Sequence, residues 1–80
     1  GIRDFFVQVG AFLVEENAGK LSVKLSYFGE PVHLNEINIE GNSFYRVRVG
    51  PVRDVESADA LIQQLIKAGY ADTHLVTDSE

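Results

Sequence analysis

The chain has 80 residues, of which 45% are hydrophobic and 24% are charged, and its formal net charge at pH 7 is −5. This length allows one domain with a single core, and the composition is that of a folded domain rather than a disordered tail. The acidic balance argues against nonspecific nucleic-acid binding, which depends on clustered Lys and Arg. The absence of cysteine excludes disulfides and thiolate metal sites. No apolar run is long enough to predict membrane insertion.

The N-terminal part of the chain predicts a strand followed by a helix. Residues 5–12 predict the first strand, because apolar residues alternate with the two-residue period of a strand, and Gly10 is expected to end it. Two glutamates then suit the positive end of a helix dipole, and Gly29 with a proline just beyond it is a typical helix stop. The helix predicted at 15–28 buries apolar residues at three- and four-residue spacing, namely Ala18, Leu21, Leu25 and Phe28.

The middle of the chain predicts a β-hairpin. Residues 32–39 are rich in apolar and β-branched side chains, but their alternation changes parity, so a bulge or bend is expected near residues 35–36. A short turn at 40–43 joins this strand to a second one at 44–49. Gly50-Pro51 is expected to stop the second strand, because proline has no N–H to donate to the ladder.

The C-terminal part predicts a second helix and a short strand. Asp54 is a suitable N-cap residue for the helix, and Gly69 is a suitable stop. Residues 73–77 then predict the last strand. The apolar stripe expected to face the core comprises Ala58, Leu61, Ile62, Leu65 and Ala68.

A shift of forty residues lays the two halves of the sequence on each other. The apolar strand positions, the apolar helix positions and the glycines that follow them coincide, so the chain is one βαβ unit written twice. This order predicts an α+β, split-βαβ fold (βαββαβ, ferredoxin/RNP-like) with a pseudo-twofold repeat. Its four-stranded antiparallel sheet is expected to carry both helices on one face and the two repeated strands side by side at the centre.

The face of the sheet opposite the helices is expected to be open. Strand alternation places Phe6 and Gln8 there from the first strand, and Phe44, Arg46 and Arg48 from the third. Guanidinium groups suit a carboxylate or phosphate, glutamine suits an amide or hydroxyl, and the rings suit a sugar or a base. We therefore predict a ligand-binding face. The alternative is that the arginines and the glutamine only solvate the sheet.

The residues favour neither a metal site nor catalysis. His33 and His74 are the only histidines, and neither belongs to a cluster with metal-ligand spacing. The sequence contains no H-E-x-x-H motif and no phosphate-binding glycine loop. We expect no metal, no cofactor and no enzyme activity in this domain. RNA-recognition folds also stack bases on an open sheet, but residues 44–51 do not match their basic aromatic motif.

Two strand motifs each precede the same helix pattern, Ala-x-x-Leu-x-x-x-Leu-x-x-x-Gly. The motifs are Phe6-Val7-Gln8-Val9-Gly10-Ala11-Phe12 and Tyr45-Arg46-Val47-Arg48-Val49-Gly50-Pro51. With these motifs the chain resembles the SPOR (sporulation-related repeat) domain over nearly its whole length. The resemblance implies a noncatalytic module of the bacterial envelope that binds peptidoglycan, favours glycan strands without stem peptides, and gathers at the division septum.

The resemblance also implies roles for particular residues. The family's strand-one glutamine falls on Gln8, and the small residue that is serine in several members falls on Ala11, which has no hydroxyl. A last-strand binding position falls near His74, and the third-strand aromatic and arginine complete the set. The predicted ligand-binding residues are therefore Phe6, Gln8, Ala11, Phe44, Arg46, Arg48 and His74.

We expect residues 1–80 to form one periplasmic, monomeric domain of a longer envelope protein. The expected parent is a division protein or a protein with a separate cell-wall hydrolase domain. Its expected partner is denuded peptidoglycan, with no nucleic acid and no membrane insertion. The alternative is a protein-interaction or dimerisation module that uses the same open sheet face.

Overall fold

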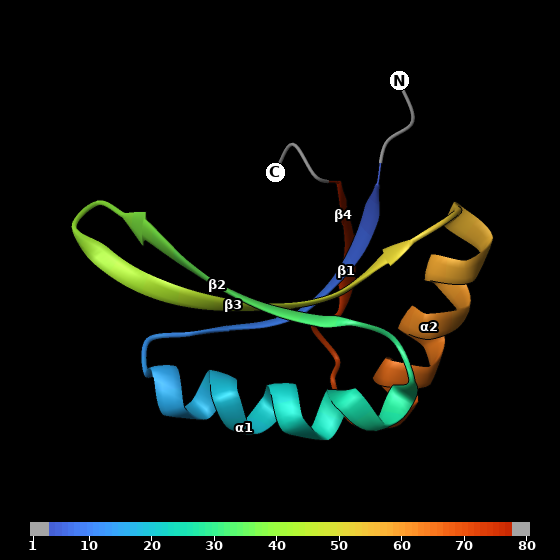
Figure 1. Cartoon of the computed structure of the whole chain (residues 1–80), viewed down its shortest axis with the longest axis horizontal. Helices are drawn as coiled ribbons and strands as arrows, with labels where there is room; N and C mark the ends of the chain where they lie inside the picture. The colour runs from blue at the N-terminus through green and yellow to red at the C-terminus, as the bar shows by residue number, and fades with distance from the viewer. Residues whose placement is uncertain (1–3, 78–80) are drawn as a thin grey trace.

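The computed structural model describes residues 4–77 of the chain. In this range the helices and strands follow the order βαββαβ, as predicted (Figure 1). The elements are β1 (Phe5–Phe12), α1 (Glu15–Leu25), the 3₁₀ turn η1 (Ser26–Phe28), β2 (Val32–Ile39), β3 (Asn42–Val52), α2 (Val55–Lys67) and β4 (His74–Thr77).

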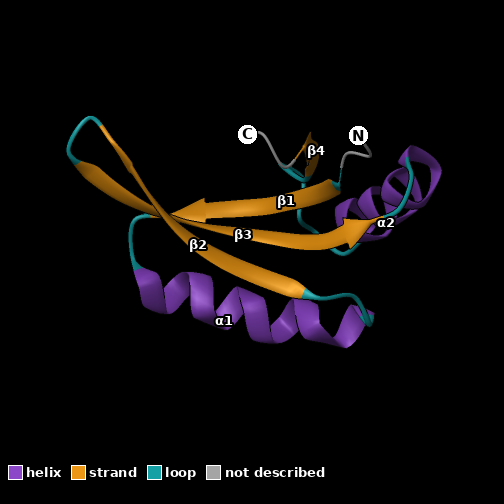
Figure 2. Ribbon diagram, turned by 45° about the horizontal axis from the view of Figure 1, so that its top comes forward, coloured by secondary structure: helices purple, strands orange, loops and turns teal. Residues whose placement is uncertain are grey.

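The four strands form one antiparallel sheet in the order β2-β3-β1-β4. The repeated strands β1 and β3 therefore lie side by side at the centre, as the forty-residue repeat predicted (Figure 2). Both helices pack on the same face, α1 mainly against β3, β2 and β1, and α2 mainly against β1 and β4. The predicted split-βαβ fold is confirmed.

The core lies between this sheet face and the two helices. Alternate residues of the central strands supply one side and the apolar helix stripes supply the other, as strand and helix periods require. Full burial of a Leu or Val side chain stabilises the fold by about 1.5–3 kcal/mol. The fully buried side chains of largest volume are Leu25, Leu65, Val7, Val47 and Val49.

β3 is longer than predicted, and β1 spans the predicted residues 5–12 without ending at its glycine. Gly10 does not end β1, and Gly50-Pro51 does not stop β3. The register passes from Gln8 opposite Arg48 to Gly10 opposite Val47, so β1 continues past a bulge. A second register shift spans Gly50-Pro51, and this shift leaves the proline outside the regular ladder. The Gly50-Pro51 peptide bond is cis.

The bulge expected in β2 is absent. Its register with β3 is unbroken from Val32 opposite Val49 to Ile39 opposite Asn42. The parity change has another cause: α1 covers the sheet near the start of β2, so Val32 is half-buried there, whereas Ile37 and Ile39 lie on the open face. The hairpin turn is shorter than predicted and consists of Glu40 and Gly41, both with positive φ.

A glycine with positive φ follows each helical segment, as predicted, although α1 itself ends earlier than predicted, at Leu25. Gly29 has φ +85° after the 3₁₀ turn that replaces the last predicted turn of the first helix. At the end of α2, Gly69 N–H donates to Ile66 O and Tyr70 N–H donates to Leu65 O, each at 3.0 Å. Ala68 is an exposed C-cap residue and not part of the buried stripe, which is a correction to the prediction.

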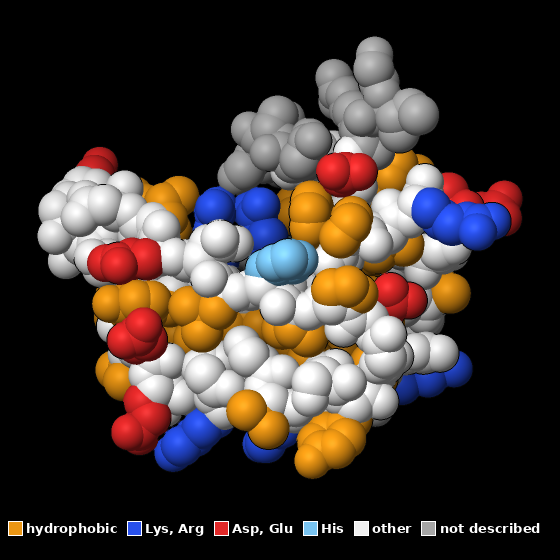
Figure 3. Space-filling view, viewed as in Figure 1, with side chains coloured by type: hydrophobic (Ala, Val, Ile, Leu, Met, Phe, Trp, Pro, Cys, Tyr) orange, Lys and Arg blue, Asp and Glu red, His pale blue; other side chains and the backbone are white. Residues whose placement is uncertain are grey.

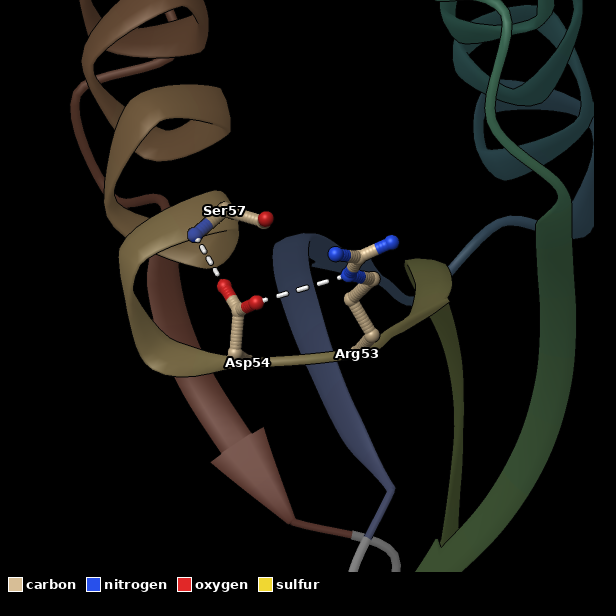
Figure 4. A network of polar contacts seen from close by, with 3 residues as sticks. All are labelled: Arg53, Asp54 and Ser57. Atoms are coloured by element: carbon tan, nitrogen blue, oxygen red, sulfur yellow. Dashed lines mark hydrogen bonds and ion pairs between the residues drawn. The ribbon is translucent and has the colours of Figure 1, made fainter.

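The N-cap of α2 is Asp54, as predicted. Its Oδ1 accepts a hydrogen bond of 2.7 Å from the main-chain N–H of Ser57, and Arg53 Nε lies 3.5 Å from its other carboxylate oxygen (Figure 4). The hydrogen bonds from Ser57, with a smaller contribution from Arg53, hold the pKa of Asp54 below its usual value near 3.8.

This lowered pKa predicts how the stability of the domain depends on pH. The contribution of Asp54 is present above the carboxyl's ordinary pKa and is lost as pH falls through the folded-state pKa. Asp54→Asn keeps a capping oxygen but does not titrate. We expect the wild type to have the higher melting temperature at pH 6 and to lose that advantage near pH 2. Thermal melts of both proteins between these values measure it, and a constant difference would contradict the cap's role.

Candidate functional site

The two central strands bring the predicted polar residues together on the open face. Gln8 is opposite Arg48, and Ala11 is opposite Arg46, so all four side chains emerge on the same side of the sheet. The Nε of Arg48 donates a hydrogen bond of 2.9 Å to Oε1 of Gln8. These two residues are forty positions apart and are equivalent in the internal repeat.

Arg48 is buried more deeply than the sequence suggested. Only 7% of its surface is exposed, although it lies on the open face, and Arg46 is half-buried. A guanidinium in this position is partly desolvated, and its attraction for an anion is screened less than that of an exposed cation. Because Gln8 orients the Arg48 side chain, its remaining N–H donors have restricted directions.

These residues line a shallow hollow of about 420 Å³, which we call the arginine hollow. Six of the seven predicted site residues line it, and Phe6 lies on the same face beside it. Figure 3 shows basic side chains gathered above the sheet, next to the end of the β2–β3 hairpin and apart from those on the helices. The hollow is lined by Gln8, Ala11, Phe44, Arg46, Arg48 and His74, together with Ile37, Ile39 and Val76.

From β1, the Phe6 side chain reaches across β3 and contacts His33 of β2. Its ring meets the ring of His33 edge to face, with 5.9 Å between centroids. Gly50 of β3 has no side chain there, and a Cβ on it would lie 3.1 Å from Phe6 Cδ1. His33 Nε2 is 3.0 Å from Gly50 O, which fixes the imidazole beside the phenylalanine. The two rings form a wall at one end of the open face.

The sequence prediction missed the contribution of β2 to this face. His33, Ile37 and Ile39 all lie on it, because β2 pairs with β3 without a bulge. An unbroken alternation over residues 32–39 would have placed them there. Val76 of β4, opposite Phe6, was also not predicted as a site residue.

The arrangement suits recognition of an anionic, ring-shaped ligand rather than catalysis. Two guanidinium groups and an amide lie next to an aromatic and aliphatic shelf formed by Phe44, Ile37 and Ile39. Among residues 4–77, no group of three or more His, Asp or Glu side chains is placed to hold a metal ion. In the same range no helix is long and apolar enough to cross a membrane.

The model of the SPOR domain family matches residues 2–76. The chain belongs to the SPOR family. The crystal structure of the RlpA SPOR domain from Pseudomonas aeruginosa is 27% identical in sequence, with a TM-score of 0.84 over 90% of this chain and 96% of that chain. The solution structure of the peptidoglycan-binding domain of the B. subtilis cell wall lytic enzyme CwlC is 26% identical, with a TM-score of 0.71 over 98% and 92% of the two chains. No curated protein matches the sequence significantly.

SPOR domains are noncatalytic peptidoglycan-binding domains. Membership confirms the resemblance found in the paired strand motifs. A domain that binds the cell wall acts in the envelope, outside the cytoplasm.

Proposed function

We propose that this SPOR domain binds peptidoglycan glycan strands that lack stem peptides, with the arginine hollow as the binding site. By doing so it targets a longer envelope protein, of which residues 1–80 are one domain, to the division septum. The observation that carries the proposal is the gathering of Arg46, Arg48 and Gln8 in a single hollow with an apolar shelf.

The chemistry of a denuded glycan matches this hollow. Removal of the stem peptide leaves a free lactyl carboxylate on each muramic acid, and a guanidinium can bind it with two parallel hydrogen bonds. The N-acetyl groups offer amide donors and acceptors to Gln8. The apolar faces of the sugar rings can lie on Phe44 and its aliphatic neighbours. A stem peptide would convert the carboxylate into an amide and remove the charge that the arginines attract.

The hollow is shallow, so each contact competes with water. A hydrogen bond in such a site contributes about 1 kcal/mol, or about 1.5–3 kcal/mol where one partner is charged. One domain is therefore expected to bind a short glycan weakly. Several domains bound along one polymer gain affinity through their high effective concentration, which suits targeting to a region rich in denuded strands.

Cosedimentation with purified sacculi measures the proposed specificity. Amidase treatment removes stem peptides and is expected to increase the amount of domain that sediments, because it exposes lactyl carboxylates. Binding that is absent, or that amidase leaves unchanged, would contradict the proposal. A concentration-dependent dimer in analytical ultracentrifugation, together with no sacculus binding, would favour the alternative interaction module. A muramidase digest of the treated sacculi is the control, since it should release the bound domain.

A further inference from the structure

The second strand has a free edge. β2 is the outermost strand on one side of the sheet, and among residues 4–77 it pairs with β3 alone (Figure 2). Natural edge strands are protected against pairing with another chain by shortness, by bulges, or by Lys and Pro side chains. The opposite edge, β4, has only 4 residues, whereas β2 has 8, with an unbroken register and no Lys or Pro. β2 is therefore the edge that is open to a partner strand.

Alternate residues of β2 carry the free main-chain groups. The N–H of Gly50 donates to Pro31 O at 2.9 Å, so position 31 directs its main chain toward β3. Because the register is unbroken, the odd-numbered residues of 33–39 do the same. The even-numbered residues of 32–38 direct their N–H and C=O groups away from the sheet. They form a regular ladder of donors and acceptors, which needs hydrogen-bond partners from water or from another strand.

This ladder is complementary to a second copy of itself. In an antiparallel pair centred on Asn35, Val32 of one copy lies opposite Asn38 of the other, and every outward N–H and C=O of the even-numbered residues finds a partner. Leu34 lies opposite Glu36 in the same register. The one carboxylate of β2 then faces a leucine and not its own copy, so like charges are not directly opposed.

We propose that two copies of this domain pair edge to edge through β2, about a twofold axis at Asn35, and join their sheets into one. The axis is perpendicular to the sheet, so the helices of both copies lie on one side and both open faces lie on the other. Ile37 and Ile39 of β2 line the arginine hollow. The two arginine hollows therefore lie on either side of the seam and face the same glycan surface.

The pairing is expected to be weak in solution and stronger on a polymer. A single pair of strands is smaller than a standard protein interface, so most of the free domain stays monomeric at low concentration. Two domains on neighbouring stretches of glycan have a high effective concentration for each other. This gain on glycan rests on the proposed function, whereas the pairing itself does not.

A single introduced cysteine tests the twofold register, because the chain has no cysteine of its own. Asn35 lies opposite its own copy in a pair without main-chain hydrogen bonds, where Cα atoms are about 4.5 Å apart. This separation is within the range of about 4.4–6.8 Å found in disulfides. We expect Asn35→Cys to form a disulfide-linked dimer under mild oxidation, and denuded glycan fragments to increase the yield. Non-reducing gel electrophoresis measures it.

Asn38→Cys is the matched control. It makes the same change at another exposed asparagine of β2, but the two copies of this position would be about 20 Å apart, at about 3.3 Å for each residue. We expect it to form little dimer under the same conditions. Equal yields from the two variants, or no dimer from Asn35→Cys, would overturn the proposed pairing.

Leu34→Glu tests what the pairing does for glycan binding. Leu34 is opposite the buried Val47, so it lies on the helix side of β2, away from the arginine hollow. A glutamate there faces Glu36 of the other copy, and this repulsion occurs twice in the pair. We expect about fivefold weaker binding to amidase-treated sacculi, and wild-type affinity for a denuded fragment too short to hold two domains.

Ile66→Glu makes the same change in charge on α2, at a residue of similar exposure, 40% against 36%. We expect it to bind sacculi like the wild type. Equal binding of sacculi by the two variants would overturn the gain from pairing and leave the proposed function standing. Failure of the wild type to bind denuded glycan would overturn the proposed function and this gain, while the cysteine result decides the pairing by itself.

Discussion

Arg46→Gln is expected to lower the affinity of the domain for amidase-treated sacculi by about ten- to a hundredfold. A hydrogen bond between charged groups contributes about 1.5–3 kcal/mol, and about 1.4 kcal/mol corresponds to a factor of ten. The side chain lies in the arginine hollow and is half-buried, so its charge is screened less than that of an exposed arginine. Cosedimentation at a series of protein concentrations measures the change.

Arg53→Gln is the matched control. It removes the same charge, but Arg53 lies beside the N-cap of α2, and 89% of its side-chain surface is exposed. We expect sacculus binding to change little and both variants to keep the wild-type melting temperature within error. Equal losses of binding in the two variants would show that net charge, and not the arginine hollow, determines affinity.

Gly50→Ala is expected to destabilise the domain by about 3 kcal/mol or more, a large part of the stability available to 80 residues. Gly50 has φ +140°, a conformation that L-residues rarely adopt. An added Cβ would lie 3.0 Å from Phe5 O and 3.1 Å from Val52 N. These are main-chain atoms of paired strands, so neither can move without disturbing the sheet. Urea denaturation measures the free energy of unfolding.

Gly41→Ala separates the two causes of this loss. Gly41 also has positive φ, at +85°, but nothing lies within 4 Å of an added Cβ. This variant should therefore show only the conformational cost, about 1–2 kcal/mol. Equal losses at the two glycines would mean that the contacts around Gly50 contribute nothing. Because Phe6 also packs on Gly50, we expect the Gly50→Ala molecules that remain folded to bind glycan less well than the wild type.

The local features of this protein could be predicted from its sequence. Both helices, the capping carboxylate of Asp54 and the closing glycines depend on residues within one or two turns. Strand alternation likewise fixed the shared face of Gln8, Arg46 and Arg48, because the two-residue period is a property of the strand itself. The forty-residue repeat then indicated which strands are central, since equivalent halves must pack symmetrically.

Only the tertiary structure decided how the strands align and where they end. Register depends on hydrogen bonds between segments about forty residues apart, which no local pattern encodes, so the continuation of β1 past Gly10 and of β3 past Gly50-Pro51 was missed. The burial of Arg48 and its bond to Gln8 follow from that register.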